Sequence, residues 1–282
     1  MKRSFRFNKL YVIESLEADE KQTGTELYND LLRWKVIGTE KLSAEIINAN
    51  SKKEFFSIIQ RIQSDCKKED IFPIIHLEIH GSKYLDGLVL NSGELIRWME
   101  LYDDLVRLNE SIGNNLFLTM AVCHGAHLMQ LIKIDKPSPY WGIIGSFDEI
   151  YQQDILVRYN QFYDEFLTSF DLDKSIERLQ KANEIMPADY RYINSEETFE
   201  KVYNDYLNEQ FSTKAIKKRA NDTIIEENLN IVTRNDKRKF YRDFRKRLEK
   251  TKKHYFQKHH DIFFMIDKFP NNKNRFKVNV TP

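Results

Sequence analysis

Apolar, strand-like runs alternate with amphipathic, helix-like segments along most of this chain, and this alternation constrains the fold more than any other feature. Residues such as Phe55, Ile58, Ile59 and Ile62 recur at helical spacing between two strand-like runs. Strands alternating with helices predict βαβ crossovers and therefore an α/β fold with a mainly parallel sheet flanked by helices. The predicted strands are 8–16, 43–51, 74–82, 116–122 and 140–147, and the predicted helices are 23–37, 52–66, 94–109, 124–132 and 148–170.

Charge divides the chain unevenly. Residues 211–282 contain 20 Lys and Arg but only 8 Asp and Glu, which leaves the first 210 residues with a net charge of −11. The basic region consists of helix-like segments and a buried closing segment at 261–269. We therefore expect a main domain over residues 1–190 and a basic, helical C-terminal appendage over 191–282. The appendage either packs against its own acidic body or meets an anionic partner.

Cysteine content and hydropathy indicate whether the protein is membrane-bound, secreted or cytoplasmic. The longest apolar runs are too short for a membrane span, and the first 20 residues lack the apolar core and cleavage site of a secretory signal. Two cysteines, Cys66 and Cys123, make a disulfide framework improbable in a chain of 282 residues. These features predict a cytoplasmic protein with no membrane partner.

The run IIHLEIHGS at 74–82 places His76, Glu78 and His80 at alternate positions of an apolar strand. Residues four apart in a strand are about 13 Å apart, so the two histidines cannot share one ligand shell. We expect His76 to lie in the core and His80 to reach the open end of the strand. Glu78 either orients the His80 ring by accepting its N–H or pairs with a basic side chain elsewhere.

His80 and Cys123 each end an apolar strand and are each followed closely by glycine, in IHG and CHG. The carboxyl ends of parallel strands gather reactive groups at one edge of a sheet. An imidazole beside a thiol makes a general base and nucleophile pair. A cysteine at a strand end is also often a small buried apolar residue, so both interpretations stay open.

The motifs HLEIHG and AVCHGAH, 43 residues apart from His80 to Cys123, resemble those of caspase-like cysteine peptidases. This clan includes caspases, metacaspases, gingipains, separase and the bacterial CHAT-domain proteases, and the resemblance covers residues 8–185. It implies that His80 and Cys123 form a catalytic dyad without a cofactor or metal. It also implies that the N–H groups of Gly81 and Cys123 form an oxyanion hole.

The chain departs from this family pattern in two places. Ala121 stands where metacaspases carry an acidic residue, so their substrate preference does not transfer. Asp148 and Glu149, after the strand at 140–147, are candidates for the floor of a pocket for a basic side chain, although acidic residues near a helix start are also ordinary dipole partners. The short link after Cys123 leaves little room for a cleavable loop, and we expect a single uncut chain.

The resemblance implies an endopeptidase acting on protein substrates, similar to stand-alone bacterial effectors of antiviral defence or cell suicide. Such an effector is released by a signal nucleotide, a nucleic acid or a partner protein. Three alternatives remain. The first is a metal-dependent hydrolase that uses some of His80, Cys123, His124 and His127. The second is a nucleic-acid- or nucleotide-binding module based on the basic region. The third is an inactive scaffold.

Overall fold

The computed structural model describes residues 5–39, 41–182 and 189–280, and the chain divides into two compact units. The first unit extends to Ile132 and resumes from Ser138 to Ser195. The second unit contains Lys133–Pro137 and the chain from Glu196 onward.

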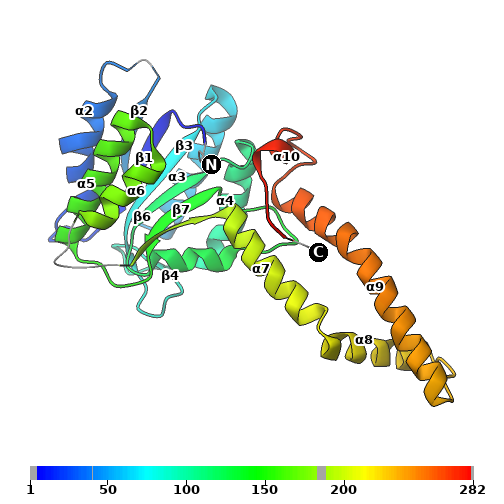
Figure 1. Cartoon of the computed structure of the whole chain (residues 1–282). Helices are drawn as coiled ribbons and strands as arrows, with labels where there is room; N and C mark the ends of the chain where they lie inside the picture. The colour runs from blue at the N-terminus through cyan, green and yellow to red at the C-terminus, as the bar shows by residue number, and fades with distance from the viewer. Residues whose placement is uncertain (1–4, 40, 183–188, 281–282) are drawn as a thin grey trace. The chain divides into compact units, whose positions relative to one another are not determined.

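A mixed, mainly parallel sheet forms the centre of the first unit, and it confirms the predicted α/β class (Figure 1). The strand order is β2-β1-β3-β6-β7-β8 in the described residues. Adjacent strands pair in parallel from β2 to β7, whereas β8 is antiparallel to β7, and β4 and β5 form an antiparallel extension of β3. The strands are β1 (Lys9–Ser15), β2 (Ser43–Asn48), β3 (Pro73–Gly81), β4 (Gly87–Val89), β5 (Leu95–Arg97), β6 (Phe117–Ala121), β7 (Gly142–Ser146) and β8 (Tyr190–Asn194).

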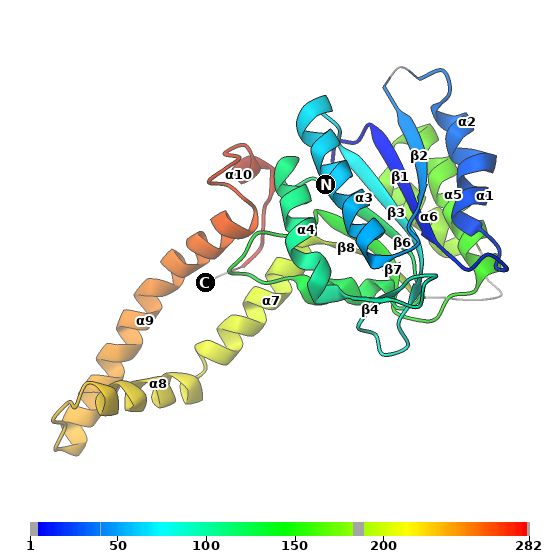
Figure 2. The same ribbon diagram turned by 180° about the vertical axis from the view of Figure 1, so that it is seen from behind.

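Helices cover both faces of this sheet (Figures 1 and 2). One face carries α5 (Gln152–Ser169), α6 (Leu172–Lys181) and a continuous helical segment made of α1 (Thr23–Leu27), the π-helical η1 (Tyr28–Leu32) and α2 (Arg33–Val36). The other face carries α3 (Lys52–Glu69) and α4 (Trp98–Ser111). A 3₁₀ helix, η2 (Gly125–Leu131), follows β6 where the sequence predicts a helix.

An aromatic side of α5 fixes that helix on the sheet. Its Tyr159, Phe162, Tyr163 and Phe166 recur at helical spacing and are fully buried, as expected for core residues. The Tyr159 hydroxyl donates to the carbonyl of Met120 in β6, and the Tyr163 hydroxyl lies 2.6 Å from Thr119 Oγ1. These contacts hold α5 over β6, near the strand end that carries Cys123.

The second unit is helical in its described residues. It contains α7 (Ser195–Gln210), whose first residue belongs to the first unit, followed by α8 (Thr213–Glu226), α9 (Arg234–Phe263) and α10 (Asn272–Arg275). Phe199 of α7 packs against Phe263 and Phe264 at the end of α9, and Tyr203 of α7 stacks on Phe199. All four rings are buried. This aromatic cluster gives the unit a small core of its own.

Three features differ from the sequence-based expectation. The hairpin β4–β5 and the strand β8 were not predicted, because their runs are only three to five residues long. The helix expected from residue 94 begins at Trp98, since Leu95–Arg97 pair with β4. The boundary expected after residue 190 lies after Ser195, because β8 pairs with β7.

Within the described parts of the chain, no helix combines the length and the apolar character needed to cross a bilayer.

Candidate active site

The ends of β3 and β6 bring His80 and Cys123 to neighbouring positions. His76 pairs with Thr119 and Glu78 with Ala121 in the parallel register of these strands. This pairing ends two residues before His80 and Cys123, where His80 instead pairs with Val89 of β4 and Cys123 lies in the turn after β6. Both predicted residues therefore lie at or just beyond the ends of neighbouring strands, at the carboxyl end of the sheet.

Gly81 makes an unusually close approach to Cys123. A Cβ atom on Gly81 would lie 1.8 Å from the carbonyl oxygen of Cys123 and 2.7 Å from its carbonyl carbon. Both neighbours are backbone atoms, which cannot turn aside as a flexible side chain can. The contact therefore requires glycine at position 81.

Two backbone N–H groups stand at the predicted oxyanion hole. The Ser82 N–H donates to the Gly87 carbonyl, while Gly81 is opposite Leu88. Hydrogen-bonded and non-bonded pairs alternate in an antiparallel ladder, so the Gly81 N–H is directed away from β4. Among the described residues no other residue accepts a hydrogen bond from the Cys123 N–H, whereas the next two N–H groups donate to Asp148 and Val122.

A carboxylate that the sequence analysis did not select contacts His80. Nε2 of His80 lies 2.8 Å from Oε2 of Glu20, in the loop that follows β1. Partial burial acts to raise the pKa of Glu20, but the hydrogen bonds from His80 and from the Glu17 N–H outweigh it and lower that pKa. Glu20 is therefore ionised near neutral pH and accepts the Nε2–H of the ring. Nδ1 of His80, which has no hydrogen-bond partner in the described residues, is left as the acceptor.

Glu78 does not have the orienting role toward His80 that was considered for it. Its carboxylate accepts from the Thr23 hydroxyl at 2.8 Å and lies 3.1 Å from Nε2 of His76. His76 is fully buried as predicted, and its other ring nitrogen contacts Thr119 at 2.8 Å. Complete burial raises the pKa of Glu78 despite these hydrogen bonds. Glu78 is thus a core residue behind the site, and the contact with His80 belongs to Glu20.

The Cys123 thiol is half-buried and contacts the loop before α5. Sγ lies 3.4 Å from the Ile150 nitrogen and 3.6 Å from the Ile150 oxygen. Burial raises the pKa of Cys123, the Ile150 N–H opposes this effect, and the negative charge of Glu149 adds to it. The thiol is therefore protonated at neutral pH in this arrangement, and within the described residues no hydrogen bond joins it to His80.

Asp148 and Glu149 lie in the exposed loop between β7 and α5. One oxygen of the Asp148 carboxylate accepts a hydrogen bond from the Asp189 N–H at 3.1 Å, and this bond joins the loop to the residue before β8. Glu149 has an electrostatic influence on Cys123, which places its charge near the thiol. Both residues precede α5 by several positions and are not in its first turn.

The other histidines and the second cysteine have separate environments. Nδ1 of His124 lies 2.8 Å from the Phe147 carbonyl, and the His127 ring packs on Phe147. Over residues 5–39, 41–182 and 189–280, no group of three or more His, Cys, Asp and Glu side chains is arranged to hold a metal ion. Cys66 is buried in α3, and burial together with Asp65 raises its pKa to about 12, which makes it unreactive.

Comparison with known proteins adds no family assignment. The sequence matches no protein-family model, and no curated protein matches it significantly. The resemblance to caspase-like peptidases therefore depends on the motifs around His80 and Cys123, and the function is argued from the site.

Proposed function

We propose that this chain is a caspase-like cysteine endopeptidase with a His80–Cys123 dyad. The observation that supports the proposal is the close approach of Gly81, next to His80, to the Cys123 backbone, at the ends of the paired strands β3 and β6. An imidazole, a half-buried thiol and backbone N–H groups are the groups that acyl transfer needs.

The raised pKa of Cys123 and the contact with Glu20 define the first step of the proposed mechanism. Because the thiol is protonated, a base has to remove its proton as attack begins. Glu20 accepts from Nε2–H of His80, which leaves Nδ1 to take the proton. The thiol turns from the Ile150 carbonyl toward His80, and Sγ forms a bond with the carbon of the scissile carbonyl.

The remaining steps use the same groups. The carbonyl oxygen gains negative charge, which the N–H groups of Gly81 and Cys123 stabilise, and each such donor typically contributes about 3–4 kcal/mol. The C–N bond then breaks as His80 returns the proton to the leaving amine. Water, deprotonated by His80, attacks the thioester, releases the carboxylic acid product and restores the thiol.

Substrates and control follow from the same proposal. The substrate is a protein, and Glu149 with Asp148 forms the acidic side of the pocket that receives the side chain before the cut bond. We also propose a cytoplasmic effector, of the kind used in bacterial antiviral defence, in which the second unit receives the activating signal. The net charge of +12 over residues 211–282 favours an anionic signal.

A covalent probe tests the peptidase without knowledge of the substrate. Peptides with a C-terminal acyloxymethyl ketone and varied side chains before the ketone are incubated with the whole chain, and adducts are located by mass spectrometry. We expect a thioether at Cys123 that is lost in Cys123→Ala and strongly slowed in His80→Ala, while Cys66→Ala reacts normally. A peptide library cleaved equally well by wild type and Cys123→Ala would refute the proposal.

A further inference from the structure

The second unit has an exposed basic surface on one side of α9. The helix contains 12 Lys and Arg against four Asp and Glu. Seven of the basic residues, all exposed, fall within an arc of about 140° when 100° is assigned to each residue. We call this set the basic stripe, and it consists of Arg238, Lys239, Arg242, Arg245, Lys246, Lys250 and Lys253.

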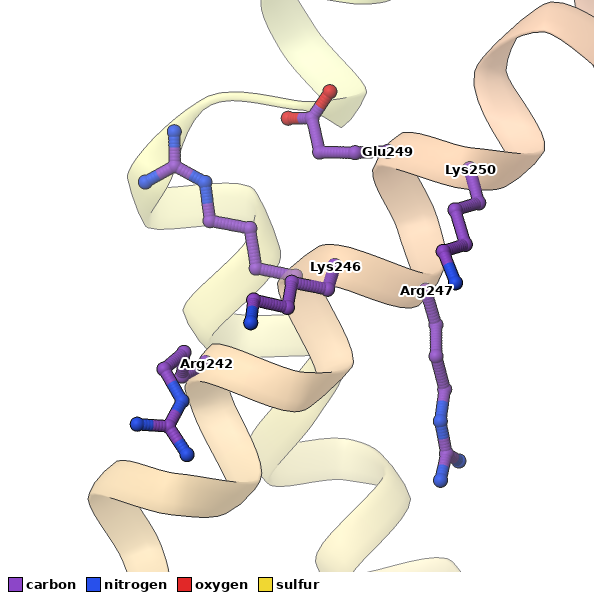
Figure 3. Close-up of a pocket in the computed structure, with 6 residues that line it drawn as sticks. Arg242, Lys246, Arg247, Glu249 and Lys250 are labelled. Carbon is purple, nitrogen blue, oxygen red and sulfur yellow. The ribbon is translucent and has the colours of Figure 1, made fainter.

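The charges of the basic stripe are almost unneutralised. Of its seven members, only Arg242 forms an ion pair within the described residues, with its chain neighbour Asp243 at 3.4 Å. Glu249, the one acidic residue in the same arc, pairs with Lys252 at 2.8 Å. Figure 3 shows Arg242, Lys246, Arg247 and Lys250 extending outward from the α9 ribbon. Repulsion between like charges that lack ion-pair partners destabilises the folded unit, and a bound anionic ligand would relieve this repulsion.

The opposite side of α9 packs within the unit. The Tyr241 hydroxyl donates to Asn221 in α8, and the half-buried Phe240 and Phe244 rings stack at 5.8 Å. By the same 100° per residue, Phe240, Tyr241 and Phe244 lie outside the arc of the stripe, and Tyr241 contacts α8. A helix that binds a membrane surface instead exposes large apolar residues beside its basic ones. The arrangement therefore favours an anionic partner that is bound through charge alone.

The spacing of the stripe matches a nucleic-acid backbone. From residue 238 to residue 253 the helix rises about 22 Å, so the seven charges are about 3.7 Å apart along the axis on average. Each strand of a duplex presents one phosphate per roughly 3.4 Å of axis. Three of the seven residues are arginines, whose planar guanidinium groups bind phosphate oxygens in pairs.

We infer that the basic stripe of α9 binds double-stranded nucleic acid through its phosphates, without regard to base sequence. The arc contains only charged residues over positions 238–253, so it lacks the amide side chains that commonly read base edges. This inference does not depend on the peptidase proposal, because none of its residues belongs to the candidate active site.

The test measures binding of the whole chain to a fluorescent 20-base-pair DNA duplex at several KCl concentrations. If about six phosphates are contacted, log K falls with log salt at a slope of about −5. A matched RNA duplex distinguishes the two kinds of nucleic acid, since phosphate contacts alone predict binding of both. Vesicles containing phosphatidylserine serve as competitor and should not displace the duplex at equal anionic charge.

Two triple variants with the same change in net charge distinguish binding through the basic stripe from binding that depends only on the net positive charge of the unit. Arg242→Gln/Lys246→Gln/Lys250→Gln should weaken duplex binding about a hundredfold at 150 mM salt and reduce the slope by about 3. Lys214→Gln/Lys217→Gln/Lys218→Gln, at exposed positions of α8, should change affinity less than threefold. Thermal melts verify that both variants fold. Absence of binding at 50 mM salt, equal losses in both variants, or displacement by the vesicles would overturn the inference.

Discussion

Glu20 and His80, 60 positions apart in the sequence, join the loop after β1 to the end of β3 through a 2.8 Å contact between carboxylate and imidazole. β1 and β3 are neighbouring parallel strands, so their carboxyl ends meet at one edge of the sheet. The carboxylate fixes which ring nitrogen carries the proton. Glu20 is therefore a positioning residue for the proposed base.

Glu20→Gln should slow the reaction of Cys123 with a peptidyl acyloxymethyl ketone about tenfold or more, because the amide can donate as well as accept and no longer fixes the ring. The rate constant for inactivation should fall, with little change in the concentration of half-saturation. Such a split separates positioning from substrate binding. Glu20→Asp should restore part of the rate.

Glu17→Gln is the matched control for this experiment. Glu17 is an exposed carboxylate in the same loop, and its hydrogen bonds with Glu20 use only the Glu17 backbone N–H and carbonyl. Its loss should leave the inactivation rate nearly unchanged. If both variants slow the reaction equally, the loop charge as a whole and not the contact with His80 is responsible.

Gly81→Ala should separate the ends of β3 and β6, because the added methyl group meets the backbone of Cys123. We expect a loss of stability of about 1–3 kcal/mol, typical of overpacking, measured by urea unfolding. The ketone reaction should fall at least a hundredfold, since both proposed oxyanion donors are displaced. Normal reactivity in a folded variant would contradict the close approach.

Gly38→Ala serves as its control. Nothing lies within 4 Å of a Cβ at that position, and its φ of +82° makes alanine strained by the backbone alone. Gly38→Ala should lower the free energy of unfolding by about 1 kcal/mol and leave the reactivity of Cys123 unchanged.

The sequence predicted the parts of this fold that depend on local pattern. The parallel strands and long helices of the first unit follow from apolar periodicity, and the pairing of β3 with β6 agrees with the predicted parallel sheet. The antiparallel strand β8 was missed because Tyr190–Asn194 alternates weakly and is stabilised by its pairing with β7. Short strands depend on partners that are distant in sequence.

The candidate site was harder to predict at the level of side-chain partners. The strand pattern suggested Glu78 as one candidate partner of His80 and left open a basic partner for Glu78 instead; it did not identify Glu20. Glu78 instead meets Thr23, which approaches from α1. The acidic run ESLEADE at the end of β1 contains Glu20. Predicting its contact with His80 required knowing that β1 lies next to β3.

Glu149→Gln should lower the pKa of Cys123, because the negative charge of Glu149 is among the causes that raise it. The fraction of thiolate at neutral pH then increases, and alkylation by iodoacetamide becomes faster. The rate is measured against pH by mass spectrometry of the peptide that contains Cys123. Asp148→Asn is the control, since it removes a neighbouring charge while keeping an acceptor for the Asp189 N–H. An unchanged pH profile in Glu149→Gln would exclude this electrostatic role.

Glu78→Gln should make the folding stability of the protein depend less on rising pH. The folded-state pKa of Glu78 is raised by burial, so the folded chain holds this proton more tightly than the unfolded chain does. Its contribution to stability is complete below the ordinary value of 4.5 and is lost as pH rises through the folded-state pKa. Thermal melts from pH 4 upward should therefore show wild type losing stability relative to Glu78→Gln. A gain by wild type over that range would mean that the ionised carboxylate is the stable buried form.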